Sequence, residues 1–143
     1  MATYTPTLSQ TGFGSGAIDK LAPYGLVLGR ALLASLFLIS GANKIAAFDA
    51  IQAYMAAFGV PAELLSAVIA FQLTAGFALL VGFGARIAAF LLAGFSVMTA
   101  LVFHLDFADQ IQTIMFTKNI AVAGGLFVIS AGGPGPLSLN RRY

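Results

Sequence analysis

Residues 25–41 read GLVLGRALLASLFLISG, an apolar run whose only charged residue is Arg30. A helix that crosses the hydrocarbon core of a bilayer needs about 20 mostly apolar residues. With its flanks, this run makes a candidate membrane span over about residues 23–43. Comparable runs follow over residues 61–83, 85–104 and 111–131. We therefore predict an integral membrane protein with four transmembrane helices.

The composition agrees with this interpretation. Of the 143 residues, 59% are hydrophobic and 8% are charged, and the mean hydropathy is +0.95. A soluble domain carries about 25% charged residues. Most of the surface of this chain must therefore face lipid.

Glycine and proline separate the four runs. Gly59 and Pro61 precede the second, Gly82 and Gly84 separate the second from the third, and residues 132–136, GGPGP, end the fourth. These residues interrupt helices for backbone reasons. The expected fold is an all-α bundle of four membrane-spanning helices joined by short loops.

Two segments lie outside the spans. Residues 49–58, DAIQAYMAAF, space their apolar side chains at helical intervals but are too short to cross a bilayer. They predict a short amphipathic helix at the membrane interface. Residues 1–20 are rich in Thr, Ser and Gly and predict a flexible tail without the features of a signal peptide. Residues 21–143 then form the four-helix domain.

Residue usage excludes several chemistries. The chain has no cysteine, which removes disulfides, thiolate nucleophiles, cysteine-held iron–sulfur clusters and covalent haem attachment. Its one histidine, His104, cannot provide two haem ligands. No catalytic residue or metal site is expected, and no basic run is long enough to follow a nucleic acid backbone. A redox centre would belong to a partner or be a diffusible molecule such as a quinone.

Lys and Arg beside the spans predict the orientation, because cytoplasmic loops are enriched in them. One side of the bilayer holds Lys20, Arg86, Arg141 and Arg142, and the other holds Lys44 and Lys118 with most of the carboxylates. We expect both termini to be cytoplasmic.

Polar residues inside spans are costly and usually face protein or a water-filled cavity. On the first span, one stripe carries Arg30, Ala34, Phe37, Gly41 and Lys44. Polar groups from four helices lie at similar depth and form the candidate pocket, with Tyr54 beside them: Lys44, Gln72, His104 and Lys118. Asp106 would provide a proton exit.

Structural roles explain the same residues without a ligand. Arg30 and Arg86 reach the interface if their side chains snorkel. His104 serves as a cap for the third helix, and Gln72 as an interhelical hydrogen-bond partner. Lys118, well inside the fourth span, is the hardest to explain structurally.

Small residues predict helix packing. Gly25 and Gly29 form a GxxxG pair, and Gly76, Gly124 and Gly125 also lie within spans. Such residues let helices approach closely, either within the bundle or between it and a neighbour.

Residues 30–140 resemble the DoxX family of small four-helix membrane proteins. The resemblance rests on an ordered set of motifs: RALLASLFLISGANK (30–44), Phe58-Gly59-Val60-Pro61, Gly76, Arg86, His104, Lys118-Asn119, Gly133-Pro134-Gly135 and Leu137-Ser138-Leu139. It implies a bacterial inner membrane and a redox-associated setting, including quinone-linked oxidoreductases. The family often has a glutamate where this chain has Gln72, and an aspartate where it has Asn140. These differences remove a carboxylate that would carry protons.

Two functions remain open. One is a non-catalytic accessory subunit that packs against a larger membrane complex or against copies of itself. The other is a quinone-interacting subunit of a membrane oxidoreductase, with donors from the candidate pocket. A transporter is a third alternative, less favoured without internal symmetry.

Overall fold

The computed structural model describes residues 15–135 and 137–139, and within them the chain forms five helices and no strand. They are α1 (Ser15–Ala46), α2 (Phe48–Ala57), α3 (Leu64–Val81), α4 (Ala85–Phe103) and α5 (Gln110–Gly132). All except α2 are long and apolar enough to cross a membrane. The predicted all-α membrane bundle, with a short helix after the first span, is confirmed.

The helix ends follow from local chemistry. Gly82 and Gly84 adopt left-handed backbone conformations, with φ of 80° and 56°, and so make the tight turn between α3 and α4. At the start of α5, the Asp109 side chain accepts a hydrogen bond from the Ile111 amide at 2.8 Å. A short acceptor side chain in this place satisfies an amide that has no partner within the helix.

The first helix begins earlier than the sequence predicts. Residues 15–20, which the sequence predicts as part of a flexible tail, are helical, and the rest of that tail lies outside the described residues. Pro23, at which the sequence predicts the start of the span, lies inside α1. Proline removes one backbone hydrogen bond and can bend a helix without ending it.

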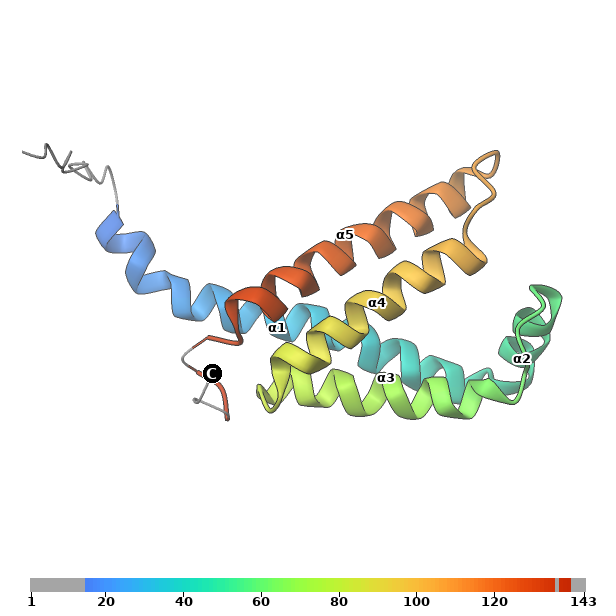
Figure 1. Cartoon of the computed structure of the whole chain (residues 1–143), viewed down its shortest axis with the longest axis horizontal. Coiled ribbons are helices and arrows are strands. Elements are labelled where there is room, and N and C mark those ends of the chain that lie inside the picture. The colour runs from blue at the N-terminus through green and yellow to red at the C-terminus, as the bar shows by residue number, and fades with distance from the viewer. Residues whose placement is uncertain (1–14, 136, 140–143) are drawn as a thin grey trace, which may run out of the picture.

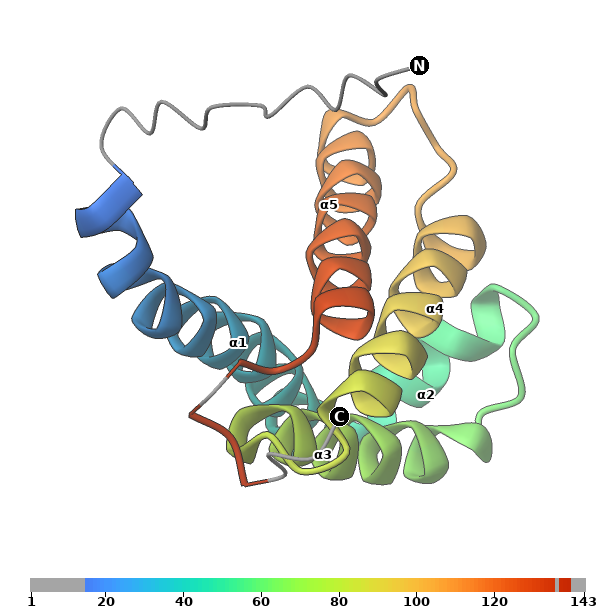
Figure 2. The same cartoon turned by 60° about the vertical axis from the view of Figure 1, so that its left-hand side comes forward.

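The helices pack as a chain of pairs (Figures 1 and 2). α1 lies along α3, α3 contacts α4, and α4 lies along α5, whereas α1 and α5 meet over a short stretch. The first turns of α1 extend away from the other helices in both views. We call the end with the α3–α4 turn (82–84) the turn end, and the end with α2 and the α4–α5 loop (104–109) the loop end.

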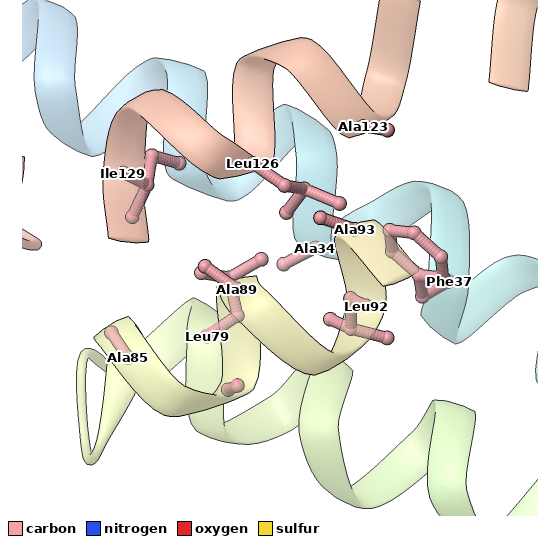
Figure 3. Packing of buried hydrophobic residues seen from close by; sticks show 11 residues of the cluster. Ala34, Phe37, Leu79, Ala85, Ala89, Leu92, Ala93, Ala123, Leu126 and Ile129 are labelled. Carbon is pink, nitrogen blue, oxygen red and sulfur yellow. The ribbon is translucent and has the colours of Figure 1, made fainter. Parts of the chain in front are cut away.

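The main core lies where α4 is sandwiched between α3 and α5 (Figure 3). Its buried α4 residues are mostly alanine, around Leu92: Ala85, Ala88, Ala89 and Ala93. Small side chains let neighbouring helices approach closely, which is the main source of helix association in lipid. Met55, Leu65 and Ile69 form a second cluster that holds α2 against α3.

Candidate functional site

The polar residues of the predicted pocket fall into separate groups. Lys44 and Gln72 meet at the α1–α3 interface through Ser40. Lys44 Nζ donates to Ser40 Oγ at 2.7 Å, and Gln72 Nε2 lies 3.5 Å from the same oxygen. Gln72 is only 2% exposed, and its Oε1 has no partner among the described residues. The predicted stripe on α1 is buried as expected from Arg30 to Gly41, and Lys44 is half-buried.

His104 and Asp106 organise the α4–α5 loop. The His104 amide donates to Ala100 O and ends α4, while its ring Nδ1 lies 2.7 Å from Gln112 Oε1. Asp106 Oδ1 accepts from the Ala108 amide at 3.2 Å. The described ring partner of His104 is therefore a residue of α5, not Asp106, and the expected proton exit has no contact to support it.

Lys118 and Tyr54 make contacts of other kinds. Lys118 is exposed, and its Nζ lies 3.3 Å from Met115 Sδ on its own helix. Tyr54 is 41% exposed and packs its ring against Phe58 and Phe103, with centroid distances of 4.9 and 5.6 Å. Among the described residues, no hydrogen bond or ring contact joins all five predicted ligand residues, so the single pocket stays a prediction.

The predicted packing glycines divide into two classes. A Cβ on Gly76 would lie 3.3 Å from the Leu38 side chain, and one on Gly125 would lie 3.4 Å from that of Leu33. Both glycines therefore contact α1. For Gly25, Gly29 and Gly124, a Cβ would meet no atom within 4 Å. These three leave open surface on the chain.

The sequence interpretation missed the principal polar site. Arg30 does not snorkel: it is 4% exposed, and Nη1 and Nη2 donate to the carbonyl oxygens of Pro134 and Leu137 at 2.8 and 2.9 Å. For Arg30 the predicted snorkelling is wrong, because two carbonyls inside the protein accept hydrogen bonds from its two Nη atoms. Two charge-assisted bonds from one planar group also fix the orientation of the segment that accepts them.

The acceptors belong to a segment after α5, residues 133–135 and 137–139, which we call the strap. Leu139 donates its amide to Val81 O at 3.2 Å, so the strap lies against the α3–α4 turn. At Gly82, a Cβ would fall 2.5 Å from Ser138 Cβ and 2.9 Å from Arg30 Nη1. Gly133 and Gly135 also have positive φ. The strap thus connects the end of α5 to α1 and to the α3–α4 turn.

Comparison with known proteins agrees with this architecture. Residues 25–105 match the model of the DoxX family. The chain is 38% identical over 124 residues to "Inner membrane protein YqjF" of Escherichia coli K12, covering 87% of this chain and 95% of that relative. It is 32% identical over 127 residues to "Inner membrane protein YphA" of the same organism, covering 84% and 91%. No solved structure matches the chain.

Proposed function

Since the chain belongs to the DoxX family and is a multi-pass inner-membrane protein, we propose that it serves as a non-catalytic accessory subunit of a redox-associated, electron-transferring membrane complex. The redox setting comes from what the resemblance to this family implies. The accessory role is argued from the surface of α1.

The observation that carries this proposal is the exposed face on the first half of α1. Leu21, Gly25, Leu28 and Leu32 recur at intervals of four, three and four residues, and the three leucines are at least 61% exposed. This spacing is that of a helix–helix seam. Gly29, next to the seam, has no neighbour within 4 Å of a Cβ. A helix of a partner would bring its backbone close at this point.

Mild detergent extraction from native membranes tests the proposal. We expect the chain to co-purify in fixed ratio with a larger subunit that shows haem or flavin absorption. Gly25→Leu with Gly29→Leu should abolish this association, because two large side chains fill the close approach. Gly94→Leu is the matched control, since Gly94 is exposed on α4 and also has nothing within 4 Å. A partner-free, monodisperse wild-type protein would contradict the proposal.

A second candidate function, the quinone-interacting subunit, is favoured by the group at Gln72. A quinol hydroxyl needs an acceptor, and Gln72 Oε1 has no partner among the described residues. A quinone carbonyl needs a donor, and Lys44 Nζ lies 2.7 Å from Ser40 Oγ, the oxygen that Gln72 Nε2 approaches to 3.5 Å. Quinone content after extraction tests this candidate. Gln72→Leu should release the bound quinone, and Lys118→Met should retain it because Lys118 lies outside the group. Equal quinone content in both variants would exclude this candidate.

For the orientation, the proposal places the turn end, and with it both termini, in the cytoplasm. The spans put Lys20 and Arg86 at the turn end, and in the sequence Arg141 and Arg142 follow the last span on the same side, whereas the loop end has Lys44 and Lys118. An excess of Lys and Arg marks the cytoplasmic side of membrane proteins.

A further inference from the structure

We propose that the first part of α1, residues 15–29, lies in the interface of the leaflet at the turn end and is not part of the membrane span. We call this segment the arm. The surface that the arm fits is a lipid surface at the level of the headgroups. The first span then begins at about residue 30, and the inference does not depend on the proposed function.

Irregular backbone at the turn end marks the edge of the hydrocarbon region. The described residues of the strap and the α3–α4 turn are not helical, and Leu137 and Leu139 of the strap are 49% and 75% exposed. Non-helical backbone that faces lipid does not occur within the hydrocarbon, because its polar groups would have no partner. Arg86, exposed in the first turn of α4, is a charge that is costly inside the hydrocarbon. The turn end therefore lies at the boundary between hydrocarbon and headgroups.

The contacts of α1 give its depth relative to this boundary. Arg30 donates to two carbonyls of the strap, and a Cβ on Gly82 would lie 2.9 Å from Arg30 Nη1. Residue 30 is therefore at the level of the turn end. Toward the loop end, a Cβ on Gly41 would lie 2.8 Å from the Leu73 side chain, so α1 and α3 run side by side from residue 30 onward.

The helix lengths measured from this level match one bilayer. At 1.5 Å per residue, residues 30–46 of α1, the 18 residues of α3 and the 19 residues of α4 are about 25–29 Å long. The hydrocarbon core of a bilayer is about 30 Å thick. The whole apolar stretch of α1, Lys20–Ala46, has 27 residues and is about 40 Å long. The arm therefore extends beyond the hydrocarbon at the turn end.

The arm leaves the bundle with its apolar side chains uncovered. The first turns of α1 extend away from the other helices (Figures 1 and 2), and none of the described side chains of the arm is buried. Leu21, Tyr24 and Leu28 are 61–65% exposed, and residues 21–29 carry no charge. Each leucine left in water costs about 1.5–3 kcal/mol relative to an apolar environment. An apolar helix outside the hydrocarbon therefore lies at the headgroup boundary, and Pro23 within the arm permits a bend toward it.

The depth of single tryptophans tests this inference, because the chain has no tryptophan of its own. Tyr24→Trp and Leu28→Trp each put one at an exposed position of the arm and should fold. Phe90→Trp is the matched control, because Phe90 is 59% exposed on α4 and lies about 8 Å from the first residue of that helix. The full chain is placed in phosphatidylcholine vesicles whose acyl chains carry bromine either near the headgroup or near the bilayer centre. These vesicles hold no partner subunit, so the result is independent of the proposed function.

Tyr24→Trp and Leu28→Trp should both lose more tryptophan emission to bromine near the headgroup, and to a similar extent. Phe90→Trp should lose more emission to bromine near the bilayer centre. If Leu28→Trp shows the same pattern as Phe90→Trp, the arm belongs to the span and the inference is overturned. If neither bromine quenches Tyr24→Trp, the arm does not lie in the lipid interface, which also overturns it.

Discussion

A single methyl group at Gly82 should open the strap. Gly82 has φ +80, and a Cβ there would fall 2.5 Å from Ser138 Cβ and 2.9 Å from Arg30 Nη1. Gly84, two residues later, has φ +56, but a Cβ there meets nothing within 4 Å. Gly82→Ala and Gly84→Ala therefore share the backbone strain, and only the first displaces the strap.

The expected magnitudes follow from these contacts. An alanine in a left-handed conformation costs about 1–2 kcal/mol, which applies to both variants. Displacing the strap breaks both Arg30 hydrogen bonds. Bonds to a charged group are worth about 1.5–3 kcal/mol each, so Gly82→Ala should cost about 3–6 kcal/mol more than Gly84→Ala. Water entering at this end of the bundle would lower that difference.

Unfolding in mixed micelles, with increasing fractions of a denaturing detergent, measures the free energy of unfolding for both variants. If Gly82→Ala and Gly84→Ala differ by less than about 0.5 kcal/mol, the strap contributes no stability through Arg30, and the reasoning is refuted.

Four other perturbations test separate parts of the structure. Arg30→Gln should lower the free energy of unfolding by about 3–5 kcal/mol in the same assay, because two carbonyls of the strap lose their donor. A loss below about 1 kcal/mol would contradict the described bonds. Gln72→Leu should change the free energy of unfolding by less than about 1 kcal/mol, because it removes a buried amide with an unpaired oxygen. Leu92→Ala should cost about 2–4 kcal/mol through the cavity it leaves in the main core. The reverse order would show that Gln72 is fully hydrogen-bonded. Green fluorescent protein fused to the C-terminus should fluoresce, and alkaline phosphatase fused at the same place should be inactive, because the C-terminus is placed in the cytoplasm. An active phosphatase would contradict the proposed orientation.

The spans and the α1 stripe could be predicted because each depends on one segment alone. Apolar length fixes how much chain crosses the bilayer, and the helical period places Arg30 and Phe37 on one buried face. The start of α1 could not be predicted in the same way. Pro23 is compatible with either the start or the interior of a helix, and the polar residues before it carry no apolar period.

The candidate pocket stays a prediction, and the sequence gives the depth of its residues more firmly than the direction in which they face. Sequence places Lys118 at a depth in α5, but the apolar residues of that helix are not gathered on one face, so its pattern gives no indication of the face that turns inward. In the structure, Lys118 is exposed. His104 was correctly predicted as a helix end, whereas its partner Gln112 lies beyond a loop whose path the sequence does not determine.

The strap was missed because its contacts have no periodic signal. Arg30 binds carbonyls more than 100 residues away, and backbone oxygens carry no residue signature. The run of glycines and prolines at residues 132–136 was interpreted as the end of a helix, which it is. Two of these residues, Gly133 and Gly135, have positive φ and also turn the chain back across the α3–α4 turn.

The most direct test of the accessory role is photocross-linking in native membranes. A photoreactive residue replaces Leu28, which is 61% exposed on the seam of α1, and, as a control, Ile87, which is 69% exposed on α4. The proposed function predicts one discrete adduct from position 28 with a haem- or flavin-bearing membrane protein, and none of that kind from position 87. Adducts with lipid alone at both positions would contradict it.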